Sequence, residues 1–262
     1  MSLDSVCAAL CHAMGISPPE HAGKGNPELL RYIGSTAGEG KFDRVFIYNP
    51  DAIGRWIIEK YPELFVEAIV PCEVEIPLVC PMPSVTPVCF ATMYSGAQPE
   101  VHGIRKYEKP VVKIETVFDA LINNGKRAAI VAQTGSSMSM IFRERDMDYF
   151  IYDTIEKANA KAAELICEDS YDFLVVYNGN YDAAMHKFGP ESVTSLAEAR
   201  VNSLVFGMFV SLIKERWKHH RTLYGFAADH GCHEIDGGCG SHGLDMPEDT
   251  ELLHFYGSYL GN

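Results

Sequence analysis

Positive charge is scarce in this sequence, and what there is does not form clusters. The chain has 22 Lys and Arg residues against 35 Asp and Glu residues, which gives a formal net charge of −13. A protein that tracks a phosphate backbone needs grouped Lys and Arg side chains. We therefore expect no nucleic acid polymer as the main partner. A small anion still fits, provided that a local cation reverses the field at one site.

Long hydrophobic runs and export signals are also lacking. The most apolar stretch, residues 203–213, is too short to span a bilayer, so it predicts a buried helix and no membrane association. The first residues lack the basic start and long apolar core of a signal peptide. Eight Cys residues at irregular spacings then indicate reduced thiols rather than a disulfide framework. Together these absences predict a cytoplasmic protein.

No linker, repeat or charge block divides the 262 residues, so we expect one domain over residues 1–262. What the chain does have is an alternation of short strand-like runs and longer helical patterns. This alternation predicts an α/β fold with three layers, in which helices cover both faces of a mainly parallel sheet. The expected strands are 44–49, 67–70, 127–132, 171–178 and 222–228, and the expected helices are 52–65, 115–126, 154–166 and 192–217.

Acidic residues follow three of the expected strands. Asp51 comes after the first strand, Asp182 after residues 171–178, and Asp229 directly after residues 222–228. Ligand sites of such folds lie beyond the carboxyl ends of the strands, so these carboxylates are expected to converge. Carboxylates that meet without a counter-charge repel one another and raise their own pKa values. A divalent cation would remove that cost.

Histidines accompany the acidic residues and complete a donor set that suits zinc. His186 follows Asp182 by four residues, which places both side chains on one face of a helix. His230 adjoins Asp229 at a strand end, and His242 lies in a Gly-rich loop that can fold back over the site. These residues predict a metal centre.

The order of these motifs resembles that of a known family. Asp51 after a strand, Thr86 in "TPVCFATMYSGAQPEVHGI", and then "DAAMHKFGPES", "ADHG" and "SHGLD" occur in the order of the alkaline phosphatase superfamily. The similarity is to its nucleotide pyrophosphatase/phosphodiesterase branch, including phosphonoacetate-hydrolase-like members, and it covers about residues 44 to 247. It implies an alkaline-phosphatase-like core without a large cap domain.

The resemblance also implies two divalent metal ions, usually Zn²⁺, with Mn²⁺ as an alternative. Carried over to this chain, one ion is held by Asp182, His186 and His242. The other ion is held by Asp51, Asp229, His230 and the hydroxyl of Thr86, which is the implied nucleophile. A threonine hydroxyl needs a base or a metal to act as a nucleophile at neutral pH.

The implied activity is two-metal hydrolysis of a small-molecule phosphate ester through a phospho-threonine. A phosphodiester or nucleotide-type substrate is expected first, and a phosphomonoester or phosphonate second. A metal-stabilised binding module without turnover is the alternative from another class, although such a module has no need of the Thr86 hydroxyl. The insertions that normally wall the pocket are short here, so a second copy of the chain in a homo-oligomer could bound it.

The sequence departs from the family pattern in places. The family Asn that contacts a phosphoryl oxygen corresponds to Tyr107, so Tyr107, Arg105 and Lys106 are the candidate substrate contacts. The Gly that usually precedes the motif histidine is Met185, which would crowd that turn. The Cys/Ser-x-Pro-x-Arg signature of sulfatases is absent after Thr86, which argues against sulfate ester cleavage.

Simpler interpretations exist for the same residues. Asp51 and Thr86 could cap helices, and Asp182 and His186 could form a surface helix pair. His242 could be a solvated loop residue. A structural zinc site offers a further alternative, with the ligands Cys232, His233, Cys239 and His242.

Overall fold

The computed structural model describes residues 1–38 and 41–261, and a seven-stranded sheet lies at its centre. The sheet has the spatial order β2-β9-β6-β1-β5-β3-β4, in which β6, β1, β5, β3 and β4 are parallel neighbours and β9 is antiparallel to β2 and β6. The mainly parallel α/β sheet is thus confirmed. The strands are β1 (Arg44–Pro50), β2 (Val74–Val79), β3 (Ala128–Gln133), β4 (Asp148–Tyr152), β5 (Phe173–Asn178), β6 (Thr222–Phe226) and β9 (Glu251–Tyr259), with a separate hairpin of β7 (His233–Ile235) and β8 (Cys239–Ser241).

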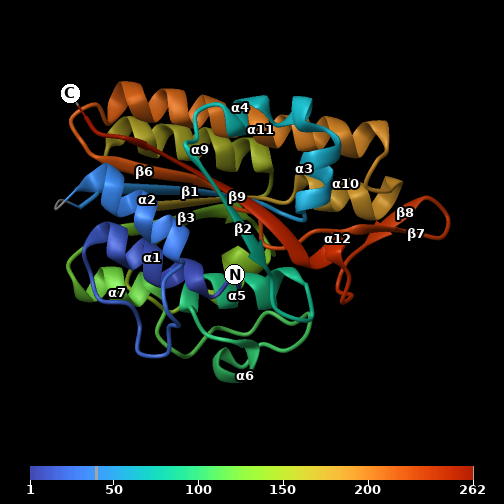
Figure 1. Cartoon of the computed structure of the whole chain (residues 1–262), viewed down its shortest axis with the longest axis horizontal. Helices are drawn as coiled ribbons and strands as arrows, with labels where there is room; N and C mark the ends of the chain where they lie inside the picture. Colours follow the sequence, from blue (N-terminus) through green and yellow to red (C-terminus); the bar gives the residue numbers. More distant parts are fainter. Residues whose placement is uncertain (39–40, 262) are drawn as a thin grey trace.

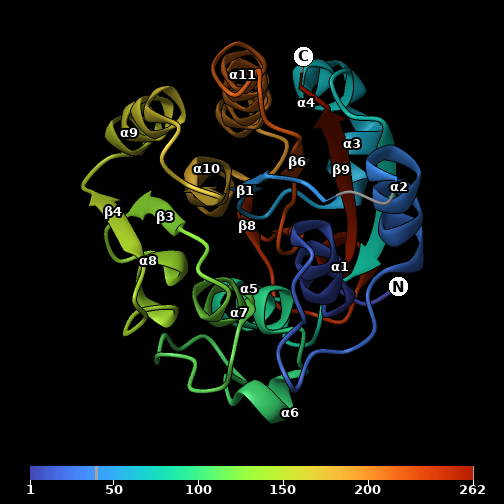
Figure 2. The ribbon, with the colours of Figure 1, turned by 90° about the vertical axis from the view of Figure 1, so that its left-hand side faces the viewer.

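Helices cover both faces of the sheet and complete three layers (Figures 1 and 2). One face carries α3 (Arg55–Lys60), α4 (Val66–Ile69), α9 (Ile155–Glu168), α10 (Asn180–Phe188) and α11 (Val193–Arg216). The other carries α1 (Ser5–Met14), α5 (Thr86–Ser95), α6 (Pro99–His102) and α7 (Val117–Asn123). The remaining helices are α2 (Pro27–Ala37), α8 (Ser137–Ile141), α12 (Pro247–Thr250) and the 3₁₀ helix η1 (Pro62–Leu64).

Aromatic side chains fill the layer between the sheet and α11. Phe206 and Phe209 of α11 pack against Phe46 and Tyr48 of β1, with ring centroids 5.5 to 6.5 Å apart. Such aromatic pairs contribute about 0.5–1.5 kcal/mol each beyond the area that they bury. The apolar run at residues 203–213 therefore has the predicted packing role through Phe206 and Phe209, whereas Leu204 and Met208 are 45% and 49% exposed, so the helix is buried on one face only.

By length and composition alone, α11 is also apolar enough to cross a membrane. In the structure it packs against α4, α9 and α10, and it buries Phe206, Phe209, Val210 and Ile213.

Residues 67–70 do not form the expected strand. They belong to α4 and the residue that follows it, and Val70 is 75% exposed. Ala68 is buried, and its backbone N–H donates to Ser203 Oγ of α11 at 3.0 Å. The segment is helical because it packs against a helix and has no neighbouring strand with which to pair. Its apolar composition alone does not distinguish these two environments.

The helix expected over 52–65 is also divided in the structure. α3 ends at Lys60, and η1 begins at Pro62. Proline disfavours the α conformation of the residue before it, which is Tyr61 here, so a break at this point follows from the sequence.

Close backbone packing holds the segment after β6 in place. A Cβ atom built on Gly231 would lie 2.0 Å from the carbonyl oxygen of Glu248 and 3.0 Å from the Cα of Gly54. Gly231 N–H also donates to Asp249 O at 2.8 Å. Only a residue without a side chain fits between these two segments.

We predict that Gly231→Ala lowers the free energy of unfolding by about 1–3 kcal/mol or more, because the added methyl group overlaps a backbone carbonyl. Gly34→Ala is the matched control. A Cβ atom on Gly34 meets no atom within 4 Å, so this change in α2 should stabilise the protein by about 0.5–1 kcal/mol. Urea denaturation measures both effects. Equal changes in the two variants would contradict the packing argument.

Candidate metal centre

Three carboxylates converge at the carboxyl ends of three adjacent strands. Asp51 follows β1, Asp182 lies in the first turn of α10 after β5, and Asp229 follows β6. β1 lies between β5 and β6 in the sheet, so its neighbours bring the other two acidic residues to the same edge. This is the convergence that the strand-end argument predicts.

A sharp turn after β1 points Asp51 into the site. Asp51 N–H still donates to Asn178 O at 2.9 Å, as in the β1–β5 ladder. The next residue, Ala52, takes a left-handed conformation with φ of 64°, and its N–H donates to Asp229 Oδ1 at 3.3 Å. Asp51 does not cap the following helix, because the N-cap of α3 is Gly54.

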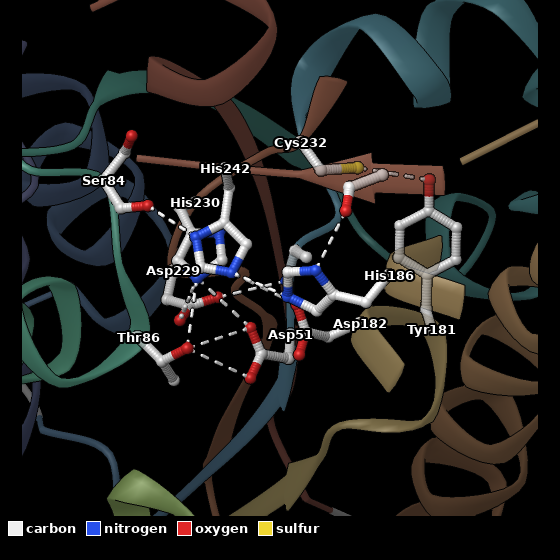
Figure 3. A network of polar contacts seen from close by, with 12 residues as sticks. Asp51, Ser84, Thr86, Tyr181, Asp182, His186, Asp229, His230, Cys232 and His242 are labelled. Carbon is white, nitrogen blue, oxygen red and sulfur yellow. Dashed lines mark hydrogen bonds and ion pairs between the residues drawn. The ribbon is translucent and has the colours of Figure 1, made fainter. Parts of the chain in front are cut away.

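The first group of donors surrounds the hydroxyl of Thr86 (Figure 3). Thr86 Oγ1 lies 3.2 Å from His230 Nε2 and 3.4 Å from Asp51 Oδ2. His230 Nε2 lies 3.3 Å from Asp51 Oδ1 and 3.4 Å from Asp229 Oδ2. Asp51, Asp229 and His230 each offer an atom within 4.8 Å of the others, a spacing at which they could hold a metal ion.

The second group of donors comes from α10 and the loop after β8. Asp182 Oδ1 lies 3.3 Å from His186 Nε2 and 3.5 Å from His242 Nε2, and the two imidazole nitrogens lie 3.2 Å apart. The rings of His230 and His242 stack with centroids 4.1 Å apart, so the two groups are neighbours. The structure thus brings together all seven predicted metal-site residues, although their ligand roles remain predictions.

Hydrogen bonds of the histidines identify which nitrogen atoms are free to bind a cation. The Nδ1 atoms of His186, His230 and His242 lie 2.9 to 3.0 Å from the carbonyl oxygens of Gly240, Gly231 and Ser84, respectively. A carbonyl only accepts, so each Nδ1 carries a proton, and Nε2 is the ring nitrogen that faces the carboxylates and is left to bind a cation. Backbone carbonyls commonly orient metal-binding histidines in this way.

Two carboxylate oxygens also indicate that this site could bind cations. Asp182 Oδ1 and Asp229 Oδ2 are buried, and neither has a hydrogen-bond partner among the described residues. A buried charged oxygen without a partner is costly, so native proteins rarely leave one unexplained. Divalent cations placed in the two groups would satisfy both oxygens, and the mixed carboxylate and imidazole donors suit zinc.

The pKa values follow from burial and crowding. Burial, and then the charge of Asp182, raises the pKa of Asp51 to about 7. Burial and the charge of Asp51 raise the pKa of Asp229 well above its usual value. Burial opposes ionisation of Asp182 too, but His186 and His242 lower its pKa below the usual range. Burial lowers the pKa of His230 to about 3, which keeps its ring neutral.

Thr86 is the first residue of α5, and its side chain does not cap the helix. The N-cap position belongs to Val85, and Pro87 follows in the first turn. The Thr86 hydroxyl is instead directed into the first donor group, and the residue is only 4% exposed. Of the stretch quoted above, residues Thr86–Ser95 form α5, and all ten are buried.

Asp249 stabilises the loop that carries His242, a role that the sequence did not predict. This fully buried carboxylate accepts hydrogen bonds from His233 Nδ1 at 2.7 Å and from Leu244 N–H at 2.8 Å. The two donors follow His230 and His242 closely in the chain. Asp249 thus holds both ends of the segment between the two metal-site histidines.

The crowding expected at Met185 is relieved by a glycine. A Cβ atom on Gly240 of β8 would lie 2.7 Å from both the carbonyl oxygen and the sulfur of Met185. The larger residue before His186 therefore packs against a glycine on the neighbouring hairpin. His186 keeps its place in the second donor group.

The alternative zinc site does not assemble among the described residues. Cys232 Sγ lies 3.5 Å from Tyr181 OH, and Cys239 Sγ contacts Lys187 O. His233 bonds to Asp249, whereas His242 joins Asp182. The four side chains point to different partners, so they do not share one ion.

A cavity of about 250 Å³ opens beside Thr86, Asp51 and Asp182. Of the three candidate substrate contacts, Tyr107 lines it, whereas Arg105 and Lys106 lie outside its lining, and the substrate contact itself stays a prediction. Arg105 Nη2 donates to Glu100 O at 3.2 Å, and Lys106 pairs with Glu108 at 3.4 Å.

Other residues of the cavity were not identified from the sequence. Tyr177 lines it and donates its hydroxyl proton to Asp51 Oδ2, and Lys109 lies on the wall with Tyr107. Residues 133–137, which connect β3 to α8, also line it. The strand-end argument, applied to the expected strand 127–132, would have identified this connection.

Comparison with known proteins agrees with this arrangement. Residues 109–251, more than half of the chain, match the sequence model of the family "Type I phosphodiesterase / nucleotide pyrophosphatase". Asp51 and Thr86 lie before the matched range. No curated protein matches the chain in a sequence search.

Solved structures share the fold at low sequence identity. Murine ectonucleotide pyrophosphatase / phosphodiesterase 5 superposes with a TM-score of 0.58 at 16% identity, over 74% of this chain and 58% of that one. An inactive threonine-to-alanine variant of it, in complex with AMP, gives a TM-score of 0.59 at 16% identity, over 74% of this chain and 59% of that one. The chain thus spans about three-fifths of the length of these proteins.

A further similar structure is the C-terminal periplasmic domain of the phosphoethanolamine transferase EptC from Campylobacter jejuni. Its TM-score is 0.56 at 14% identity, over 83% of this chain and 80% of that one. The fold is alkaline-phosphatase-like. The matched sequence range and the shared fold establish that this chain belongs to the type I phosphodiesterase / nucleotide pyrophosphatase family of the alkaline phosphatase superfamily.

Proposed function

We propose that the protein is a two-metal hydrolase of phosphate esters with Thr86 as its nucleophile. Membership of the family supports phosphoester hydrolase or transferase chemistry in general. The observation that carries the finer proposal is the position of the Thr86 hydroxyl, which lies within 3.5 Å of both His230 Nε2 and the Asp51 carboxylate and beside a second donor group.

The donor atoms fit two divalent cations, Zn²⁺ first and Mn²⁺ second. Asp182, His186 and His242 would hold one of them. Asp51, Asp229 and His230 would hold the other, together with Thr86 Oγ1. Bound there, the ions would supply Lewis acidity, which lowers the pKa of a coordinated hydroxyl and neutralises charge on the phosphoryl group.

The chain itself places the nucleophile and receives its proton. The Thr86 hydroxyl lies 3.4 Å from Asp51 Oδ2, so a carboxylate that can accept its proton lies next to the attacking oxygen, whereas a bound cation would occupy the Nε2 lone pair of His230. A bond forms between Thr86 Oγ1 and phosphorus while the ester P–O bond breaks, and the leaving alkoxide takes a proton to become an alcohol. Water then attacks phosphorus, the Thr86–phosphate bond breaks, and the hydroxyl regains its proton. In total one water is consumed, and the second product is phosphate from a monoester or a phosphate monoester from a diester.

Tyr177 is suited to orient the carboxylate in this arrangement. Its hydroxyl donates a hydrogen bond to Asp51 Oδ2, and the other oxygen of the carboxylate, Asp51 Oδ1, faces His230. Burial, and then the charge of Asp51, raises the pKa of Tyr177 well above its usual value, so this hydroxyl keeps its proton as a donor. A tyrosine in this position favours one orientation of the carboxylate over the other.

Comparison with the murine relative supports the role of Thr86. The inactive variant of that protein carries a threonine-to-alanine change and binds AMP. A diester or nucleotide-type substrate is therefore our first assignment for this chain. A monoester or phosphonate is the second, and the small cavity of about 250 Å³ favours it.

Removing the Thr86 hydroxyl tests the nucleophile. We expect Thr86→Ala to lower kcat by about 10³-fold or more on p-nitrophenyl phosphate esters, because no other oxygen replaces the attacking atom. Bound metal, measured by elemental analysis, should change little, since carboxylates and imidazoles supply most of the donors. Thr92→Ala, which removes a hydroxyl from the same helix, is the control and should stay active.

Two outcomes would contradict this assignment. Loss of metal together with activity in Thr86→Ala would indicate a structural role for the hydroxyl. Metal-replete wild-type protein that turns over no phosphate ester would indicate a binding module instead.

Asp51→Asn tests the carboxylate crowding in metal-free protein. The folded-state pKa of Asp51 is raised to about 7, whereas the unfolded value is about 4, so ionisation destabilises the fold progressively as the pH rises between these values. With chelator present, we expect Asn to raise the melting temperature relative to wild type at pH 7 and above, with little benefit at pH 4. Added Zn²⁺ should stabilise wild type more than the variant. A variant that is less stable than wild type at pH 8 in chelator would refute the crowding argument.

A further inference from the structure

The cavity beside Thr86 has a second, distinct wall. Asp51, Thr86 and Asp182 lie on the side of the donor groups. The other wall consists of Tyr107 and Lys109, from the segment before α7, and of residues 133–137 between β3 and α8. In the proposed reaction, the part of the substrate beyond phosphorus would occupy the space between these walls. The second wall is therefore where the structure can select one alcohol over another.

Lys109 is the cation of this wall, and the structure holds it in place. Its Nζ donates to the carbonyl oxygen of Gly135 at 2.7 Å, and it lies 5.2 Å from the centroid of the Tyr107 ring. The residue is half-buried, and no carboxylate lies within 4 Å of its Nζ among the described residues. An ammonium group carries three donors, so others remain available to a ligand after the bond to Gly135.

The contrast with a nearby lysine shows why this matters. Lys113 pairs with Glu144 at 2.6 Å, and its side chain is 73% exposed. Its charge is thus neutralised at the surface. Lys109 lines the cavity and takes part in no ion pair among the described residues, so its charge is not compensated by a neighbouring carboxylate. A fixed ammonium group with free donors attracts an oxyanion and binds it by charge-assisted hydrogen bonds.

The size and polarity of the cavity limit what that oxyanion belongs to. Its volume of about 250 Å³ is below the range of about 300–1,000 Å³ that is typical of sites for drug-sized ligands. The side chains of Gln133, Thr134 and Ser137, which carry amide or hydroxyl groups, line it. Tyr107, which is exposed, is the aromatic residue of this wall. These groups suit a short, polar leaving group rather than a large apolar one.

We propose that Lys109 is a specificity-determining residue, and that the preferred substrate is a small phosphate ester whose leaving group carries a second oxyanion, either a carboxylate or a phosphoryl group. The proposal rests on the proposed hydrolase function, because it assigns the leaving-group side of the same site. Thr86 attacks phosphorus and the ester P–O bond breaks as before, while Lys109 binds the second oxyanion of the departing alcohol. Water supplies the oxygen of the released phosphate.

A pair of substrates of nearly equal size tests this assignment. Phosphoglycolate and 2-hydroxyethyl phosphate differ in that a carboxylate of the first is replaced by a neutral hydroxymethyl group in the second. We expect wild-type kcat/KM to favour phosphoglycolate by about 10- to 100-fold, as a charge-assisted hydrogen bond allows. Lys109→Met should remove that preference, mainly through KM, and leave turnover of 2-hydroxyethyl phosphate nearly unchanged. Lys113→Met is the matched control and should keep the preference.

A third substrate distinguishes the two sources of the oxyanion. Ethanediol bisphosphate carries a second phosphoryl group where phosphoglycolate carries a carboxylate. If Lys109→Met loses the preference for phosphoglycolate over 2-hydroxyethyl phosphate, the proposal is supported and the oxyanion is a carboxylate. If it loses the preference for ethanediol bisphosphate over 2-hydroxyethyl phosphate, the proposal is supported and the oxyanion is a phosphoryl group. An equal loss on all three substrates would overturn it, because Lys109 would then act on the transferred phosphoryl group. A wild-type enzyme that does not distinguish the three substrates would overturn it as well.

A binding measurement separates this proposal from the proposed function. Calorimetry on metal-loaded Thr86→Ala protein measures affinity for phosphoglycolate and for 2-hydroxyethyl phosphate without turnover. Adding Lys109→Met should weaken the binding of phosphoglycolate alone, by about 10-fold or more. If wild type turns over no ester but this difference in affinity is present, the hydrolase assignment fails and the oxyanion contact stands. If the two ligands bind alike, the oxyanion contact fails whatever the activity.

Discussion

Repulsion among three carboxylates, two of them fully buried and the third partly buried, is the constraint on which the rest of this structure depends. Asp51, Asp182 and Asp229 meet at one edge of the sheet, and burial and mutual charge raise the pKa values of Asp51 and Asp229. Three strands and the helix that follows β5 hold them there, so the backbone cannot relieve the crowding by moving apart. Bound cations would relieve it instead, which would couple the stability of the fold to the chemistry of the site.

The histidines depend on the same backbone framework. Backbone carbonyls fix the ring orientation of His186, His230 and His242, so their Nε2 atoms face the carboxylates. Asp249 then holds both ends of the segment between the last two histidines. A donor set assembled in this way is rigid before any ligand arrives. Preorganisation of this kind is what phosphoryl transfer requires, because positioning and charge neutralisation account for most of its catalysis.

Much of the fold and the donor set could be predicted from the sequence, for identifiable reasons. The strand cores around Phe46 and Val175 are continuous apolar runs, and parallel strands buried on both faces produce that pattern. Their carboxyl ends then located Asp51, Asp182 and Asp229. Residues 67–70 were predicted wrongly, since one acidic residue followed by three apolar residues fits a strand or a helical turn equally well. The antiparallel β9 was not predicted, because its long-range pairing with β2 and β6 leaves no local signal.

The sequence by itself determined which chemical groups are available: carboxylates and imidazoles in a set order, and a hydroxyl before a proline at the start of a helix. Spacing along the chain and strand ends were enough to bring the carboxylates and imidazoles to one centre, whereas Thr86 was assigned to it through the resemblance to the family. Tertiary structure decided which wall faces that centre. Lys109 lines the cavity, whereas Arg105 and Lys106 do not. Its ammonium group donates to the carbonyl oxygen of Gly135, 26 residues away in the chain, which also lines the cavity. The direction of a lysine side chain is set by such distant partners, and local sequence does not encode them.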